Sequence, residues 1–488
     1  MENVTVRSQE PTIVWNHFAD INAIPRASKK EEEIVAFMVA FGKKLGLETI
    51  VDPVSNVIIR KPATPGMESR KSVVLQSHLD MVHQKNADVN FDFATEGINM
   101  KVDGDWVKAA GTTLGADNGL GVAAIMSVLS SNDLEHPAIE ALFTIDEETG
   151  MTGAQGLEAG YLTGDILLNL DTEEDDEIDI GCAGGIDVTA SKSYAELIVE
   201  DDCLGFRISV KGLQGGHSGM DIHKGLGNAN KIMNQLLKSN LDIIKLSQID
   251  GGSLRNAIPR ESVALLSCLE ENIQQLKENF ETTRDIILKE FATTEPNLSC
   301  ELLEVERPLT CMSVEDQTAL INALENAVNG VYSMSPGIPD LVESSNNIAR
   351  VNVGNKDMHI ASLTRSSVEK SKMEVANALK ETFETNGFEV QFSGSYPGWS
   401  PNRDSPILKV LTSIYSDLFK SEPAVVACHA GLECGLLGTH YPDMDMISFG
   451  PTIKGAHSPD ERASISSTQR FWTFLQLILK NIPEKQSS

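Results

Sequence analysis

Several features that would assign a chain to a class at once are missing from this sequence. It has no run of about 18 apolar residues, so a membrane-spanning helix is not expected. Its first eight residues lack the apolar core of a signal peptide. The seven cysteines include no Cys-x-x-Cys pair and are odd in number, which favours free thiols in a reducing compartment over a disulfide framework. These absences together predict a cytoplasmic protein that is not attached to a membrane.

Basic residues are also in short supply. The chain has 40 Lys and Arg against 70 Asp and Glu, and its formal net charge is -30. A nucleic-acid-binding protein needs basic patches to meet phosphates, so no nucleic acid is expected as a partner. Hydrophobic residues make up 41% of the 488, which provides a sizeable core and excludes wholesale disorder. At about 150 residues per domain, this length predicts about two to four domains.

Two common enzyme motifs are absent as well. No Gly-x-Ser-x-Gly sequence occurs, which argues against a serine hydrolase with a nucleophile elbow. The glycine-rich segment 115–121 lacks the Gly-x-Gly-x-x-Gly pattern, and Asp117 within it would repel a phosphate. A dinucleotide site is therefore not expected there.

The pattern of the chain predicts two kinds of domain. Up to residue 186, short apolar strands such as 72–77, 139–145 and 166–171 alternate with turns and helices, which indicates an α/β domain with a mixed, mostly parallel sheet flanked by helices. From there the strands alternate polar and apolar residues, and a strand, helix and strand pattern occurs twice, which indicates an inserted α+β domain. We expect the domain boundaries at 1–186, 187–394 and 395–488, with the first and third segments forming one catalytic domain.

Three consecutive acids, Asp146, Glu147 and Glu148, follow the apolar run 139–145. The carboxyl ends of strands in open α/β sheets are where ligands bind. Adjacent carboxylates repel one another unless a cation or protons offset their charge. A divalent metal would satisfy this, with one glutamate as a ligand and its neighbour free as a base.

Further ionisable side chains end apolar runs or lie in the turns beside them. They are His78, Asp80, Asp117, Asp171 and His457. Zinc takes histidine nitrogen and carboxylate oxygen, and this set suits two zinc ions that clamp a hydroxide and polarise a carbonyl. Because His78 and Asp80 are two residues apart on a strand, they face the same side, so Asp80 can orient the imidazole.

These segments resemble a known family. Five motifs are similar to the metal-site motifs of the co-catalytic dizinc peptidases related to glutamate carboxypeptidase: SHLDMV at 77–82, LGADNG at 114–119, DEETG at 146–150, NLDTEE at 169–174 and GAHSPD at 455–460. Four more resemble a dipeptidase branch of that family: GCAGGID at 181–187, LRNAIPR at 254–260, YPGW at 396–399 and HAGLECG at 429–435. The resemblance covers nearly the whole chain.

The resemblance implies roles for the strand-end residues, with two Zn²⁺ per chain and Co²⁺ or Mn²⁺ as substitutes. Asp117 would bridge both ions. His78 and Asp171 would complete one metal site, and Glu148 and His457 the other. Glu147 would be the general base, and Asp80 would support His78. Glu173 and Glu174 lie close to Asp171 in sequence, and either one as a ligand is an alternative that the sequence leaves open.

For the inserted domain, the resemblance implies a lid that closes over a dipeptide and a homodimer formed through that lid. His217 would stabilise the oxyanion, Asn256 and Arg365 would contact the substrate, and Gly431 would contact it from the catalytic domain. Arg365 is expected to grip the substrate carboxylate. The expected activity is hydrolysis of unblocked L-dipeptides, including Xaa-His dipeptides such as carnosine. The alternatives are an aminoacylase or carboxypeptidase of the same superfamily, or a metal-binding protein with a dead site.

Overall fold

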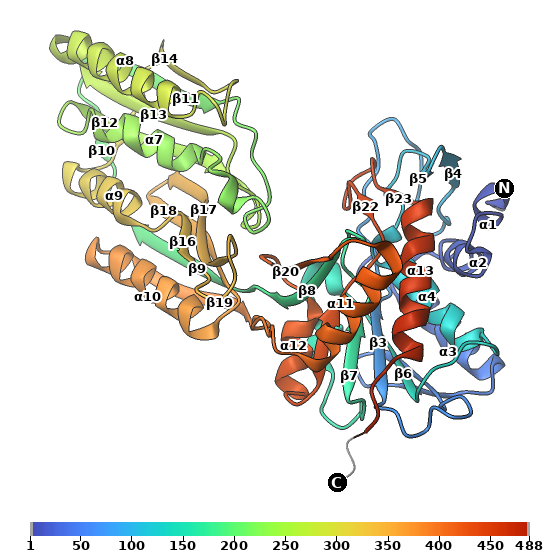
Figure 1. The fold of residues 1–488 in the computed structure, drawn as a ribbon. Coiled ribbons are helices and arrows are strands. Elements are labelled where there is room, and N and C mark those ends of the chain that lie inside the picture. The colour runs from blue at the N-terminus through green and yellow to red at the C-terminus, as the bar shows by residue number, and fades with distance from the viewer. Residues whose placement is uncertain (1–2, 486–488) are drawn as a thin grey trace. The chain divides into compact units, whose positions relative to one another are not determined.

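The computed structural model describes residues 3–485, and the chain divides into two compact units. Unit 1 comprises Met1–Gly181, Trp399–Ala427 and Leu432–Ser488, and unit 2 comprises Cys182–Gly398 and Cys428–Gly431. In Figure 1, unit 2 carries the green to light-orange part of the chain, and unit 1 carries the blue and red ends. None of the helices within residues 3–485 combines the length and hydrophobicity needed to cross a bilayer. All seven cysteines lie in this part of the chain and none of them forms a disulfide.

The main sheet of unit 1 has eight strands in the order β1-β2-β6-β3-β7-β21-β8-β20. Their bounds are β1 Glu48–Val51, β2 Val57–Lys61, β3 Val73–His78, β6 Ile139–Thr144, β7 Ile166–Asn169, β8 Glu177–Cys182, β20 Ala424–Cys428 and β21 Asp445–Ser448. Strands β6, β3, β7 and β21 pair in parallel, whereas β1, β2 and β6 pair antiparallel, as do β21 and β8. The mixed α/β class is confirmed, with four neighbouring parallel strands, β6, β3, β7 and β21, in the sheet. Every residue of β3, β6 and β7 is buried, as expected of central parallel strands covered on both faces.

Helices and a small second sheet complete unit 1. The helices are α1 Val4–Arg7, α2 Thr12–Ile21, α3 Glu32–Lys44, α4 Ala116–Ser130, α5 Glu147–Gly150, α6 Thr152–Gly156, α11 Pro406–Phe419, α12 Glu433–His440 and α13 Ile465–Lys480. Helix α4 packs on β3 and α2, whereas α11 packs on β21 and α13. The small sheet has the order β22-β23-β5-β4, with β4 Met100–Asp103, β5 Trp106–Ala109, β22 Ile453–Lys454 and β23 Arg462–Ser464. Helix α4 is apolar and buried nearly all round, which places the turn at its N-terminus deep inside the unit.

The main sheet of unit 2 has the order β14-β11-β13-β12-β17-β18-β9-β19, and β16 pairs with β17 beside it. The bounds are β9 Gly184–Ser193, β11 Cys203–Lys211, β12 Ile244–Gly252, β13 Ser262–Leu269, β14 Ser299–Val305, β16 Gly330–Met334, β17 Val342–Gly354, β18 Asp357–Ser366 and β19 Glu389–Tyr396. The short strands β10 Leu197–Ile198 and β15 Thr310–Cys311 form a separate pair. The helices are α7 Ala229–Lys238, α8 Ile273–Glu290, α9 Val314–Asn326 and α10 Glu369–Thr385, with short turns η1 Ile222–Lys224 and η2 Glu270–Asn272.

Unit 2 is built from two βαββαβ halves. In one half, β11-α7-β12-β13-α8-β14 gives the strand order β14-β11-β13-β12; in the other, β9-α9-β17-β18-α10-β19 gives β17-β18-β9-β19. Each is a ferredoxin-like arrangement. The halves join edge to edge where β12 pairs antiparallel with β17, and the first is inserted between β9 and α9 of the second. This explains why the sequence shows the same cycle of strands and helices twice.

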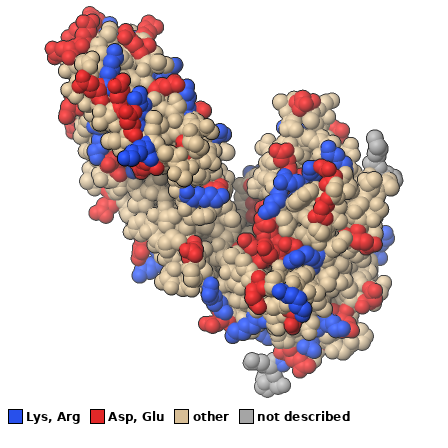
Figure 2. Space-filling view, turned by 45° about the horizontal axis from the view of Figure 1, so that its top comes forward, with Lys and Arg blue, Asp and Glu red and all other residues tan. Residues whose placement is uncertain are grey.

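The two faces of this sheet differ. Helices α7 to α10 lie in a row over one face and cover a core that includes Ile186, Val188 and Ala190 of β9. Because side chains alternate along a strand, Gly185 and Asp187 face the other side. On the face of the molecule shown in Figure 2, acidic and basic side chains are interspersed over both units.

Candidate metal centre

The predicted strand-end residues of unit 1 come together at one edge of its sheet. His78 ends β3, Asp171 follows β7, and Glu147 and Glu148 open α5 just after β6. Since β3, β6 and β7 are parallel neighbours, their carboxyl ends meet at this edge. Two further residues reach it from outside the sheet: Asp117 in the first turn of α4, and His457 between β22 and β23.

Asp117 lies at the middle of this cluster. Its Oδ1 is 3.2 Å from His78 Nε2, and its Oδ2 is 3.1 Å from His457 Nε2. Asp171 Oδ1 lies 3.5 Å from His78 Nε2, and Glu148 Oε2 lies 3.0 Å from His457 Nε2. One carboxylate therefore faces two histidines with different oxygens, and Asp171 lies beside the first histidine as Glu148 lies beside the second.

Asp80 is buried beneath this cluster and fixes two of its parts. Its Oδ1 lies 3.2 Å from His78 Nδ1 and accepts the backbone N–H of Glu147 at 3.0 Å. Its Oδ2 accepts the N–H of Glu148 at 3.2 Å and the hydroxyl of Ser28 at 2.8 Å. A single carboxylate thus orients the imidazole of His78 and holds the turn that carries both glutamates.

Burial and mutual repulsion shift the ionisation of the cluster. Burial raises the pKa of Glu147 well above its ordinary value, with Asp171 and Glu148 adding repulsion. Hydrogen bonds that His457 donates to the carboxylates of Asp117 and Glu148 raise the pKa of its imidazole to about 11. In the absence of a cation, protons on the histidines and on some carboxyls offset the negative charge. The same charge would be offset by divalent cations.

The donor set fits two such cations. Within residues 3–485, the ligand atoms of His78, Asp117 and Asp171 lie within 4.8 Å of one another, and so do those of Asp117, Glu148 and His457. The group His78, Glu147 and Glu148 meets the same criterion, and so does the buried group Glu31, Asp80 and Asp146. Glu148 Oε1 is buried without a hydrogen-bond partner in this part of the chain. Since buried polar atoms are normally paired, this oxygen is suited to bind a cation. Histidine nitrogen with carboxylate oxygen is a zinc donor set.

Glu173 and Glu174 differ in their surroundings. The carboxylate of Glu174 pairs with Lys454, which directs it away from a ligand role. Glu173 is in none of the four metal-ligand groups found among residues 3–485. Burial, with Asp117 as the next cause, raises the pKa of Glu173 to about 8. The negative charge of Asp117 in the cluster therefore acts on the carboxyl group of Glu173.

Glu461 supports the centre and was missed by the sequence analysis. Its two carboxylate oxygens accept the backbone N–H groups of Leu114, Gly115, Ala116 and Asp117, at 2.7, 2.9, 2.7 and 3.2 Å. A carboxylate at the N-terminus of α4 satisfies N–H groups that the helix leaves unpaired. Glu461 lies four residues after His457, so it ties the Asp117 turn to the segment that carries this histidine.

A second missed group lies under the strand ends. Glu433 of α12 is fully buried, and its Oε2 accepts hydrogen bonds from Gln76 Nε2 at 2.5 Å and Thr144 Oγ1 at 2.6 Å. Gln76 Oε1 in turn accepts the amide of Asn169 at 2.5 Å. Burial raises the pKa of Glu433 to about 8. These residues link β3, β6 and β7 directly behind the cluster.

Arg26, also missed, connects two loops of the centre. Its guanidinium is buried and donates to the carbonyls of Leu79 and Asp80, both at 3.1 Å, and to that of Gly115 at 2.5 Å. Asn118 has a related role, because its amide donates to the carbonyl of Leu170 at 2.7 Å and to Asp171.

The candidates of the predicted lid all lie in unit 2. His217 Nδ1 accepts the backbone N–H groups of Gly219 and Met220, at 3.2 and 3.0 Å. An imidazole that accepts at Nδ1 carries its proton on Nε2, so His217 presents a donor there. Asn256 is exposed, and its carbonyl accepts the N–H of Ser218 at 2.8 Å. The structure therefore brings His217 and Asn256 together.

Arg365 on β18 is 4% exposed and donates from Nη1 to the hydroxyl of Tyr396 at 3.0 Å. Gly431 belongs to the short segment Cys428–Gly431 that clusters with unit 2. In that segment His429 Nε2 lies 2.8 Å from the hydroxyl of Ser345, and its carbonyl oxygen contacts Gly219 closely. Burial, with Arg365 as the next cause, lowers the pKa of His429 to about 3, so its imidazole is neutral.

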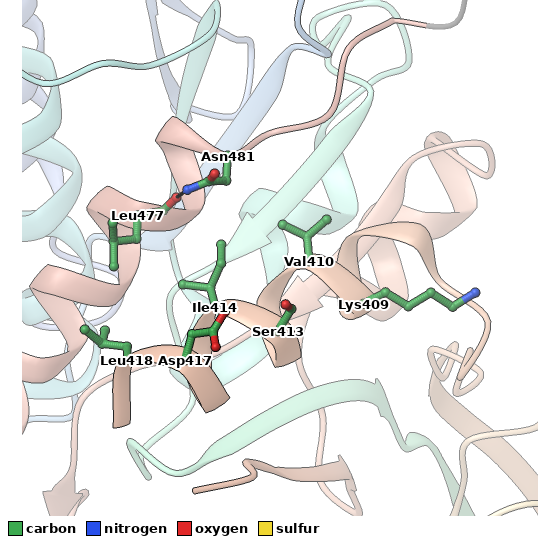
Figure 3. Close-up of a pocket in the computed structure, with 8 residues that line it drawn as sticks. All are labelled: Lys409, Val410, Ser413, Ile414, Asp417, Leu418, Leu477 and Asn481. Carbon is green, nitrogen blue, oxygen red and sulfur yellow. Dashed lines mark hydrogen bonds between the residues drawn. The ribbon is translucent and has the colours of Figure 1, made fainter. Parts of the chain in front are cut away.

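A groove on unit 1 lies away from these residues. It has a volume of about 670 Å³ and is lined mainly by α11 and α13, including Val410, Ile414, Leu418 and Leu477. Figure 3 shows these side chains together with Lys409, Ser413, Asp417 and Asn481. None of these residues belongs to the cluster, and Asp417 is the one acid among them, with no histidine or cysteine. The chemistry of the strand-end acids, and not the size of a cavity, identifies the centre.

Comparison with known proteins gives consistent matches. The model of Peptidase family M20/M25/M40 matches residues 74–481. Over 477 residues the chain is 42% identical to the cytosol non-specific dipeptidase of Escherichia coli (strain K12), covering 97% of this chain and 98% of that protein. The crystal structure of aminoacylhistidine dipeptidase from Vibrio alginolyticus matches with a TM-score of 0.89 at 42% identity, covering 99% of each chain. Human carnosine dipeptidase 1, at 15% identity, 96% and 95% coverage and a TM-score of 0.51, shares the fold alone.

Proposed function

This chain belongs to Peptidase family M20/M25/M40, and we propose that it hydrolyses unblocked L-dipeptides, Xaa-His dipeptides among them, at a two-metal centre. The observation that carries the proposal is the arrangement of Asp117, whose two oxygens face two different histidines. A carboxylate in this position suits a ligand shared by two ions. The substrate class rests on the two dipeptidases to which the chain is similar over nearly its whole length.

The metal proposal assigns one ligand set to each ion. His78, Asp117 and Asp171 would hold the first, and Asp117, Glu148 and His457 the second. We propose two Zn²⁺, with Co²⁺ or Mn²⁺ as substitutes, because histidine and carboxylate donors accept all three metals. When bound, two such ions supply Lewis acidity for the attacking water and for the scissile carbonyl.

Glu147 is the proposed general base, with Asp80 as its support. Glu148 pairs with His457 at 3.0 Å, whereas the nearest imidazole contact of Glu147 is His78 at 4.0 Å. The carboxylate of Glu147 is therefore the one we propose to accept a proton. Its carboxylate would take a proton from the attacking water and later pass it to the leaving amine. The backbone N–H of Glu147 is held by Asp80, so the base has a fixed position relative to His78.

Unit 2 is the proposed lid, formed by the inserted part of the chain. His217 would donate from Nε2 to the oxyanion of the tetrahedral intermediate, a role that its Nδ1 contacts support. Arg365 would bind the C-terminal carboxylate of the dipeptide, since guanidinium pairs with carboxylate through two parallel hydrogen bonds. Asn256 and Gly431 would add polar contacts to the substrate.

The setting of the enzyme is also a proposal. We propose a cytoplasmic homodimer. The cytoplasmic location is in line with the name of the Escherichia coli relative and with cysteines that form no disulfide in residues 3–485, and the dimer is what the family resemblance implies. Light scattering coupled to size-exclusion chromatography measures the oligomeric state. A mass of one chain would contradict the dimer and leave the hydrolytic proposal intact.

Hydrolysis by zinc-loaded protein of an Xaa-His dipeptide, its N-acetylated form and a tripeptide tests the proposed function. We expect cleavage of the free dipeptide only, because an unblocked amino end and a nearby carboxylate define the substrate. Preference for the acetylated dipeptide would indicate an aminoacylase or carboxypeptidase pocket. Bound zinc without cleavage of any of the three would indicate a metal-binding protein with a dead site.

A further inference from the structure

Four adjacent strands of unit 2 place a row of residues directly opposite one another. Ser345 of β17 is in register with Arg365 of β18, Arg365 with Gly185 of β9, and Gly185 with Tyr396 of β19. The row lies on the sheet face opposite the helices, because Ile186 next to Gly185 points into the helix-covered core. Residues opposite each other on one face are near neighbours. Arg365 and Tyr396 are therefore separated only by the strand that carries Gly185.

Gly185 is the gap that lets these two side chains meet. A Cβ atom at this position would lie 2.7 Å from Cε1, Cζ and Oη of Tyr396, which is closer than real contacts allow. The phenol ring therefore lies across the backbone of Gly185, and its hydroxyl accepts a hydrogen bond from Arg365 Nη1 at 3.0 Å. Glycine inside a strand commonly marks such a close approach. Two of the segments that resemble the dipeptidase branch, at 181–187 and 396–399, supply these two residues.

The guanidinium has one donor that is unpaired in the described part of the chain. Arg365 is 4% exposed, and its Nε is buried without a hydrogen-bond partner within residues 3–485. A buried N–H without an acceptor is costly, so an acceptor is expected there. Asp187, an acid on the same face, is engaged by Arg255 at 3.2 Å. The charge of Arg365 is therefore not neutralised by an ion pair with a carboxylate in the described part of the chain.

We propose that Tyr396 is a positioning residue that holds Nη1 of Arg365, so that Nε and Nη2 receive the C-terminal carboxylate of the dipeptide side-on, with Gly185 as the gap that permits it. This inference rests on the proposed function and deepens it. Burial raises the pKa of Tyr396, so its phenol stays neutral. A neutral acceptor orients the guanidinium without cancelling the charge that the substrate carboxylate needs.

The replacement Tyr396→Phe removes the acceptor and keeps the ring. Steady-state kinetics on a dipeptide and on its C-terminal amide, the amide also assayed as a competitive inhibitor, measure the effect. We expect KM for the dipeptide to rise about three- to tenfold, kcat to stay within about twofold, and the constants for the amide to be unchanged. Tyr332→Phe is the matched control, because Tyr332 is 52% exposed on β16 of the same unit. Its kinetics should equal those of the wild type.

Two further variants separate orientation from charge. Arg365→Lys keeps the positive charge but loses the planar guanidinium, whose paired N–H groups bind a carboxylate through two hydrogen bonds. KM for the dipeptide should therefore rise at least about tenfold. Gly185→Ala should displace the ring and raise KM as Tyr396→Phe does, and the double variant should show no additional rise, because both act on one contact. Thermal unfolding identifies a variant that fails to fold. If Gly185→Ala does not fold, the kinetics of Tyr396→Phe alone test the positioning role.

The outcomes distinguish this inference from the proposed function. An active wild type with an unchanged KM in Tyr396→Phe overturns the positioning role and leaves the dipeptidase standing. Equal increases in KM for the dipeptide and for its amide also overturn it, because the contact would then not concern the carboxylate. A wild type that cleaves no dipeptide overturns the proposed function, and the carboxylate inference fails with it.

Discussion

The two units hold their functional side chains in different ways. In unit 1 the residues of the centre are ionisable, and other carboxyl groups fix them: Asp80 fixes His78, and Glu461 fixes the turn of Asp117. In unit 2 His217 is held by backbone N–H groups of its own loop, and Arg365 by a neutral phenol. A cluster of several ionisable side chains needs hydrogen bonds from several neighbouring segments to hold it in place. The imidazole of His217 needs only the tautomer that puts its proton on Nε2.

This difference predicts a separation of effects. Substitutions in unit 1 should change metal binding or the chemical step, and substitutions in unit 2 should change kcat or KM while the metal content stays the same. The following experiments test this separation, in order of decreasing effect.

Glu147→Gln should produce the largest loss. The amide cannot take up the proton of the attacking water, so kcat should fall about 10³-fold or more. Metal content, measured by mass spectrometry of the metals, should remain that of the wild type, because Glu148 and the histidines are unchanged. Glu281→Gln, on the exposed side of α8, is the control. Activity within about tenfold of the wild type would remove Glu147 from the role of base.

His217→Ala removes the proposed oxyanion donor. The loss of one such donor costs about 10²- to 10³-fold in kcat. Metal content and metal affinity should not change, which distinguishes this variant from those of unit 1. His359→Ala, an exposed histidine on β18, is the control. A KM effect without a kcat effect would indicate that His217 binds the substrate in its ground state instead.

Glu461→Ala should weaken metal binding without removing a ligand. Four backbone N–H groups around Asp117 would lose their acceptor, so the turn would no longer be fixed. Loss of a group that orients a ligand typically costs about 10- to 100-fold in metal affinity. Competition with a chelator measures this affinity. An unchanged affinity would show that the turn is held by α4 alone.

His429→Gln should change the pH dependence of stability by a small amount. The buried imidazole has its pKa lowered from 6.5 to about 3, beside Arg365, His217 and His223. Below pH 6.5 the unfolded chain therefore binds a proton that the folded chain does not, and stability is lost as pH falls from 6.5 toward 3. Between pH 7.5 and 5.5 this loss is about 1.4 kcal/mol.

Urea unfolding at these two pH values, for the wild type and for His429→Gln, isolates this contribution. Other histidines titrate in both proteins and cancel in the difference. The variant should lose less stability than the wild type on acidification, by about 1.4 kcal/mol. Equal losses in the two proteins would mean that His429 is protonated in the folded state.

The centre of unit 1 was predictable because strand ends are visible in a sequence. Runs such as 72–77 and 166–171 become β3 and β7, and the acids and imidazole that end them meet at one edge, since parallel neighbours align. Short elements such as β4, β5 and α12 were missed, because a few residues give no clear period.

The supporting residues were not predictable from one sequence. Glu461 and Glu433 act on residues that are hundreds of positions away in the chain, and no local pattern separates a buried acid from a solvated one. Arg26 likewise has no local pattern that marks it, although its guanidinium is buried between two loops of the centre. In unit 2 the row of Arg365, Gly185 and Tyr396 depends on strand pairing across the inserted half, which a single chain's pattern does not reveal.

The position of β21 has a consequence for how this protein is made. This strand is synthesised near the end of the chain, yet it pairs with β7 on one side and β8 on the other, both of which come from the first part. While the ribosome is still adding the residues of unit 2, β7 and β8 have no strand between them, and their edges can pair with other chains. Nearly all of unit 2, by contrast, comes from one continuous stretch and can fold during synthesis. The first segment of unit 1 is thus the part whose strand edges stay unpaired longest during synthesis, and closing its sheet requires pairing over a long sequence separation, which slows folding.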